Sequence, residues 1–329
     1  MRNWITGLAM VLGLAISLGY CARSVAGECG TCCCDNSNAC DSSGCVCDSG
    51  CCDCCDDFDD CDRLLGLLPS DHCFDDFISP ISNPFFFEDP RSLTEARGIF
   101  FANSLPATSN GGDADVWAAQ LRGRLSERLS VIAPRLAYLN VNQAGNPTSG
   151  LLSAPVGVKY NFVRDVDRQL LVSGGVTFFI NGSEDAASAF GDGDFHFFLT
   201  GGKQIFDYGH WLSGAGFRIP TNNNFGTQMF YWSNQFDVEL PGHVYAVGGV
   251  NWFHYMRSSN VNYTGSVGGL DLINLPAGDI AGTDVVTALA GLKWKPSANL
   301  ELGSGFEFPL TNNTDILRNR FYADVIIRY

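Results

Sequence analysis

The chain has 329 residues, a formal net charge of −15 at neutral pH and 14 cysteines. Both its acidity and its cysteines are concentrated near the N-terminus. Residues 28–79 carry thirteen Asp and Glu side chains against one Arg, whereas residues 94–329 carry twenty acidic and sixteen basic side chains. Nucleic-acid binding requires a basic surface, so this composition argues against a nucleic-acid partner.

Residues 1–27 have the pattern of a cleaved export signal. Arg2 gives a positive start, LAMVLGLAISLGY an apolar core, and SVAG a small-residue cleavage site. The apolar run, about 13 to 15 residues, is shorter than the roughly 20 of a spanning helix, so an uncleaved anchor is the weaker alternative. A lipoprotein signal at Cys21 is weaker still, because Tyr20 stands where a small residue is expected. The mature protein is therefore predicted to be exported.

Residues 28–79 form a segment rich in Cys and Asp with too few aliphatic side chains to bury a core, so cross-links or metals would be needed to order it. The oxidising environment of an exported segment favours disulfides, within the chain or to envelope partners. A thiolate metal site and a disordered acidic spacer are the alternatives, and no other cofactor is expected. The candidate disulfide or metal residues are Cys29, Cys32, Cys33, Cys34, Cys45, Cys47, Cys51, Cys52, Cys54 and Cys55.

An odd number of cysteines remains after the predicted cleavage. If cleavage follows Gly27, thirteen are left, so at least one is free or intermolecular. Residues 80–93, which are punctuated by proline and rich in Phe, are predicted to be a linker to the next domain.

From residue 94 onward, alternating runs separated by Gly, Asn, Asp and Pro clusters predict an all-β domain, 94–329. Most runs reach the roughly 9 to 11 residues that cross a bilayer at a tilt, whereas ordinary strands average about five or six. The predicted strands lie near 114–125, 129–141, 154–163, 169–180, 194–206, 210–219, 227–239, 243–255, 284–295, 299–309 and 320–329.

The connections between these runs alternate between short turns and longer polar loops, as in antiparallel transmembrane β-barrels. If both ends of the domain lie on one side of the membrane, the strand number is even. Residues 94–103 are the remaining candidate, and they complete a barrel of twelve strands that the last run, 320–329, would close. A soluble barrel or sandwich is the alternative.

One face of several runs carries no charge, and charges collect on the other. The pore-lining candidates are Arg122, Arg124, Arg135, Lys159, Glu301, Glu307 and Asp324. Basic groups on early strands and acidic groups on late ones could select small charged solutes in an open lumen. In a plugged lumen, they would only satisfy buried charge as ion pairs. Inward glycines, such as Gly175, Gly214 and Gly303, are expected to leave room inside.

The last strand ends on an aromatic residue preceded by apolar residues at alternate positions: Phe321, Ala323, Val325, Ile327 and Tyr329. This pattern resembles the assembly signal of Gram-negative-type outer-membrane β-barrel proteins, although Phe is more usual than Tyr at the end. The resemblance implies recognition by a barrel-assembly machinery, insertion into the lipid bilayer of the outer membrane with the N-terminal segment in the periplasm, and commonly solute transport.

No enzyme is expected. The five histidines are scattered, without a GxSxG or HExxH motif. His254, close to Ser258 and Ser259, is the least implausible site for lipid hydrolysis, and His196 is expected to be a lumen or packing residue. The sequence therefore predicts a porin or transporter for small polar or other small solutes. The alternative is a structural envelope anchor with a closed barrel, whose Cys-rich segment cross-links to partners or binds metal.

Overall fold

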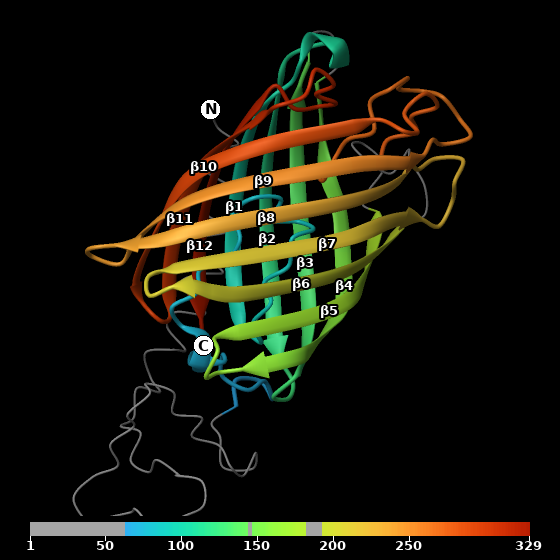
Figure 1. Ribbon diagram of the computed structural model, residues 1–329. Helices are drawn as coiled ribbons and strands as arrows, with labels where there is room; N and C mark the ends of the chain where they lie inside the picture. Colours follow the sequence, from blue (N-terminus) through green and yellow to red (C-terminus); the bar gives the residue numbers. More distant parts are fainter. Residues whose placement is uncertain (1–62, 144–146, 182–192) are drawn as a thin grey trace, which may run out of the picture.

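The computed structural model describes residues 63–143, 147–181 and 193–329, which form a closed antiparallel barrel of twelve strands (Figure 1). The predicted export signal, residues 1–27, and the ten candidate cysteines lie outside the described residues. There are also two short 3₁₀ helices, η1 (His72–Phe74) and η2 (Ala107–Ser109). The strands are β1 (Glu95–Ser104), β2 (Asp113–Arg124), β3 (Leu129–Asn142), β4 (Thr148–Asp165), β5 (Leu170–Asn181), β6 (Asp194–Phe206), β7 (Gly209–Pro220), β8 (Gln228–Leu240), β9 (Val244–Arg257), β10 (Asp284–Ser297), β11 (Leu300–Pro309) and β12 (Asn319–Arg328).

The barrel closes by pairing its first strand with its last. The register of β1 on β12 runs from Glu95 opposite Arg328 to Ser104 opposite Asn319. Every other strand pairs with its neighbours in sequence. The twelve-strand prediction is confirmed, including the strand predicted at 94–103. The pairing of β1 with β12 completes the sheet and leaves it without exposed edges.

The strands are 10 to 18 residues long, which suits a bilayer crossing. Short turns join β2 to β3, β4 to β5, β6 to β7, β8 to β9 and β10 to β11 at the end of the barrel where β12 finishes. We call this the short-turn end, and the opposite end the long-loop end. Strand β4 begins earlier than predicted because the alternation continues through Leu151, which is exposed, and Leu152, which is buried.

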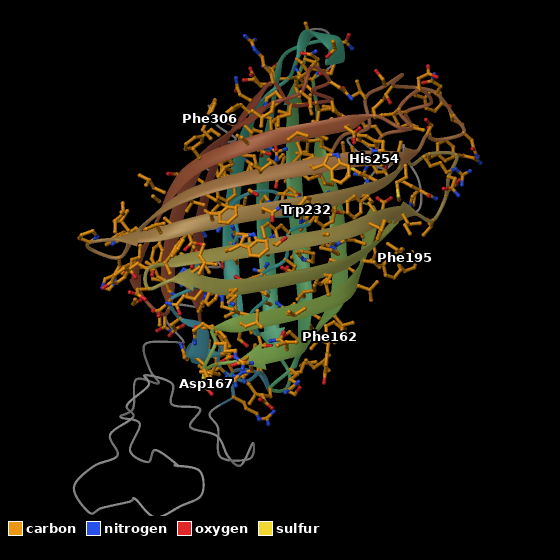
Figure 2. The ribbon with its side chains drawn as sticks, in the orientation of Figure 1. Phe162, Asp167, Phe195, Trp232, His254 and Phe306 are labelled. Atoms are coloured by element: carbon orange, nitrogen blue, oxygen red, sulfur yellow. The ribbon has the colours of Figure 1, made fainter. Side chains whose placement is uncertain are left out.

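The outer surface of the barrel is apolar. Figure 2 labels four of its aromatic side chains, Phe162, Phe195, Trp232 and Phe306, which are 40 to 55% exposed. Charged side chains collect on the inner face instead. An apolar exterior is the surface that contact with lipid requires. Within the described ranges, no helix combines the length and the apolar character needed to cross a membrane.

Residues 77–94 run inside the barrel, and every one of them is buried. We call them the luminal segment, which is drawn in blue to cyan within the strands in Figure 1. The predicted linker, 80–93, is part of it. The room that inward glycines were expected to leave is occupied: a Cβ atom on Gly214 would lie 2.5 Å from the ring of Phe87. The apolar rings and the polar groups of this segment are both matched by the inner wall, which explains its position.

The loop between β9 and β10, residues 258–283, folds into the long-loop end. Its buried side chains include Leu270, Leu272 and Ile280, and they belong to the same hydrophobic cluster as Ile81 and Phe85 of the luminal segment. The core of the molecule therefore lies in the lumen, and it is built from inward side chains of the strands together with a segment and a loop that enter from opposite ends.

Tyr329 joins the closing strand to the residues that lead into and out of the luminal segment. Its N–H donates to the carbonyl of Thr94 (2.9 Å), and its backbone oxygen accepts from the N–H of Ser70 (2.6 Å). Phe321, Val325 and Ile327, the other residues of the predicted assembly signal, alternate with buried residues and lie on the outer face. These three side chains therefore face outward from the barrel, and their role as an assembly signal stays a prediction.

Deleting Tyr329 is expected to reduce the amount of folded barrel in the membrane severalfold, because both hydrogen bonds and the terminal aromatic ring are lost. The heat-dependent gel mobility of membrane fractions measures the folded form. The variant Tyr329→Phe, which keeps the ring and the backbone, should fold normally. Normal insertion of the deletion variant would contradict this role.

Candidate functional site

All seven predicted pore-lining side chains lie on the inner face of the barrel and are at most 8% exposed. Most of them contact the luminal segment or the β9–β10 loop, or form ion pairs along the wall. The polar lumen is therefore the candidate functional site, and in the described state it is filled.

The cations of β2 and β4 hold Glu88 of the luminal segment. Arg122 donates from Nε and Nη2 to the two carboxylate oxygens of Glu88, at 2.6 and 2.8 Å, and Lys159 Nζ lies 3.1 Å from Oε1. Arg122 Nη1 also pairs with Glu95 of β1 (2.5 Å). Such close pairing offsets the large cost of removing these charges from water.

Glu301 of β11 links the late strands to the luminal segment. Its carboxylate pairs with Lys293 and with Arg328 (2.7 Å), and it accepts a hydrogen bond from the N–H of Ser79 (3.0 Å). The hydroxyl of Ser79 in turn accepts from Arg328 (2.8 Å). The side chains of Glu301, Lys293 and Arg328 are at most 1% exposed.

Asp324 of β12 pairs with Arg97 of the adjoining β1 (2.8 Å) and with Lys293 of β10 (3.2 Å). The guanidinium of Arg97 also donates to the carbonyl of Pro80 in the luminal segment (2.5 Å). Opposite charges of the first and last strands thus meet along the wall, one of the two arrangements that the sequence left open.

At the long-loop end, basic wall residues hold the β9–β10 loop. Arg135 donates to the carbonyls of Asp271 (2.8 Å) and Leu272 (2.7 Å). Arg320 donates to the carboxylate of Asp271 (2.9 Å) and also pairs with Glu307 (3.3 Å). Glu307 is therefore held within the wall, whereas Arg135 clamps the loop.

At the short-turn end, Arg124 donates to the carbonyl of Pro69 (3.2 Å), at the entry to the lumen. Burial alone would raise the pKa of the Asp75 carboxyl, but the hydrogen bond and charge of His72 and the charge of Lys295 outweigh it and lower the pKa. Because the folded-state pKa is the lower one, the ionised form is favoured by folding, and this contribution is lost as the pH falls through that pKa.

Several residues of the polar lumen were not singled out from the sequence. One signal was present: the inward charges assigned to the early strands, such as Arg122 and Lys159, were all basic. Buried cations need counter-charges, so this excess indicated an acidic partner outside those strands. The residues that were missed are Glu88, Asp89, Arg91, Arg97, Arg218, Lys293 and Arg320.

The histidines considered for enzyme chemistry are held by other contacts. His254 pairs with Asp284 (2.9 Å), but the hydroxyl of Ser258 accepts from two backbone N–H groups and that of Ser259 donates to a backbone carbonyl. His196 is buried against Tyr231. In the part of the chain that the structure describes, no three His, Cys, Asp or Glu side chains are grouped to hold a metal ion.

Comparison with protein-family models and with curated protein sequences finds no match. Solved structures do match the fold. An outer membrane channel from Pseudomonas putida F1 superimposes with a TM-score of 0.52 and 9% identity, over 77% of this chain and 100% of that chain. The NanC porin has a TM-score of 0.44 and 7% identity, over 71% and 98% of the two chains. The KdgM porin has a TM-score of 0.43 and 10% identity, over 72% and 99%. The chain thus has the fold of outer-membrane β-barrel proteins.

Proposed function

We propose that the protein is an outer-membrane channel for small polar solutes, which the luminal segment and the β9–β10 loop hold closed. One observation carries the proposal: the inner wall carries many buried charged side chains among its apolar ones, and a separate stretch of chain fills the space between them. Displacing the luminal segment would expose Arg97, Arg122, Lys159 and Glu301 to water. Twelve strands fall between the filled eight-stranded barrels and the open sixteen-stranded porins.

The fold of an outer membrane channel supports this proposal. The proposal also includes four expectations from the sequence. They are assembly by a barrel-assembly machinery, a periplasmic location of residues 28–79, disulfide or metal chemistry of the Cys-rich segment, and the absence of enzymatic activity. The chain would enter the lumen from the short-turn end, where residue 63 and Tyr329 both lie, and this end would face the periplasm.

A structural envelope anchor is the second candidate. The observation that favours it is the closure of the lumen from both ends, with charges that are paired in the described state. In such a protein, the luminal segment would never leave, and the Cys-rich segment would cross-link the barrel to partners. The two candidates differ in one measurable property, which is ion conduction after the luminal segment is loosened.

Replacing Gly214 with valine should loosen the luminal segment, because a Cβ atom there would overlap the ring of Phe87 at 2.5 Å. Overpacking costs about 1 to 3 kcal/mol, so we expect the frequency of channel openings in planar bilayers to rise about tenfold or more. The matched control is Gly248→Val, because nothing lies within 4 Å of a Cβ atom at that position. If the wild type and both variants stay silent at every voltage, the channel proposal fails and the anchor is favoured.

A further inference from the structure

We infer that Arg122 and Lys159 form a binding site for small hydroxycarboxylates, and that Glu88 occupies this site while the channel is closed. This inference rests on the proposed function and names the class of solute that the channel takes.

The geometry around Glu88 is that of a bound carboxylate ligand. The guanidinium of Arg122 meets both oxygens, at 2.6 and 2.8 Å, and the ammonium of Lys159 meets one of them at 3.1 Å. All three side chains are at most 4% exposed. The planar fork of arginine matches a carboxylate in two-point geometry. A free solute carboxylate would fit the same three nitrogen atoms.

The wall around this site has further hydrogen-bond donors, and these bind oxygen atoms of the luminal segment. Thr200 donates its hydroxyl to the carbonyl of Glu88 (2.8 Å). Lys159 Nζ lies 2.7 Å from the carbonyls of both Asp89 and Arg91. A solute with a carboxylate and several hydroxyl oxygens presents the same kinds of acceptor, which is why the inference specifies a hydroxycarboxylate.

Glu88 is the acidic residue of the luminal segment that neutralises the cations of this site. Asp89 and Arg91 neutralise one another through two hydrogen bonds at 2.8 and 3.0 Å. Among the described residues, the carboxylate that pairs with Lys159 is that of Glu88. If Glu88 leaves, Arg122 and Lys159 lose the carboxylate that pairs with them and are exposed to the water of the opened lumen. A solute carboxylate that takes its place therefore stabilises the open state, and solute binding is coupled to opening.

The long-loop end repeats the pattern. Arg218 donates to the backbone oxygens of Leu270 (2.5 Å) and Ile273 (3.2 Å), beside the contacts of Arg135 with the same loop. When the loop moves aside, both guanidinium groups are available to an anion. Cationic donors then lie at the outer opening as well as at the Arg122 and Lys159 site.

The test uses the full chain in planar bilayers, with sodium gluconate as the anionic probe and sorbitol as its neutral counterpart of equal carbon number. We expect gluconate to raise the open probability of the wild type about tenfold, and sorbitol to leave it unchanged. The variant Lys159→Met removes the same cation from Glu88 and from gluconate, so it should open more often without solute, and gluconate should raise its open probability by much less than tenfold. The matched control, Lys203→Met, removes an exposed lysine and should respond as the wild type does.

If Lys159→Met does not fold, a second measurement tests the same inference. The reversal potential of Gly214→Val in a sodium gluconate gradient should indicate preference for the anion. Three results would overturn the solute assignment: equal responses to gluconate and sorbitol, equal behaviour of the two lysine variants, or a preference for sodium. In each case, the measured currents would still support the channel. Silence of every form would overturn the channel, and the solute assignment with it.

Discussion

Replacing Glu301 with glutamine is expected to lower the free energy of unfolding by about 3 to 5 kcal/mol, because two cations lose a common buried partner. The carboxylate pairs with Lys293 and Arg328, and both side chains are at most 1% exposed. An amide of the same size keeps the volume but removes the charge. The same substitution weakens the hold on the luminal segment, because Ser79 donates its N–H to this carboxylate (3.0 Å).

Equilibrium unfolding in urea, monitored in lipid vesicles, measures this loss as a fall in the midpoint. The matched control is Glu127→Gln, whose side chain is 45% exposed and lies 3.9 Å from Arg164. Exposed pairs contribute about 0 to 1 kcal/mol, so this variant should unfold close to the wild type. Equal midpoints for the two variants would show that the Glu301 cluster does not stabilise the barrel.

Replacing Phe86 with alanine is expected to release the luminal segment. Its ring stacks on Tyr231 with centroids 5.5 Å apart, lies 4.9 Å from the ring of His196, and is approached by Arg218 at 5.9 Å. Removing a buried Phe side chain costs about 3 to 5 kcal/mol. If that cost falls on the closed state, the ratio of open to closed channels rises by a factor on the order of a hundred or more.

Open probability in planar bilayers measures this change, and limited proteolysis within residues 77–94 reports the release independently. The control is Phe306→Ala, which removes an outward ring that is 47% exposed. That variant should keep the luminal segment protected and the channel closed. Protection of residues 77–94 in Phe86→Ala equal to that in Phe306→Ala would show that the Phe86 contacts do not seat the segment.

The sequence predicted the wall of the barrel well, because strand alternation is a local property. Phe321 falls on one face of the strand and Tyr322 and Asp324 on the other wherever the strand pairs, so their outward and inward positions follow from spacing alone. Closure of β1 on β12 followed from parity, because an even number of strands required one more at 94–103.

The contents of the lumen could not be predicted in the same way. The luminal segment shows no regular alternation of apolar and polar residues. A run such as FFFEDP is therefore equally compatible with an exposed linker and with a buried, irregular segment. Its partners are distant: Glu88 meets Arg122 and Lys159 at separations of 34 and 71 residues. The β9–β10 loop belongs to the longer polar loops of the predicted barrel, and nothing local indicated that Asp271 would reach Arg320 inside the barrel.

The central claim is that a conducting wall surrounds a removable luminal segment, and bilayer conductance in urea tests it most directly. Urea is added at the short-turn side at a concentration that unfolds the luminal segment but leaves the barrel folded, as checked by proteolysis and gel mobility. We expect currents to appear with urea and to disappear when it is washed out. A membrane that stays silent while residues 77–94 are open to protease would contradict the claim, because the wall itself would then be closed.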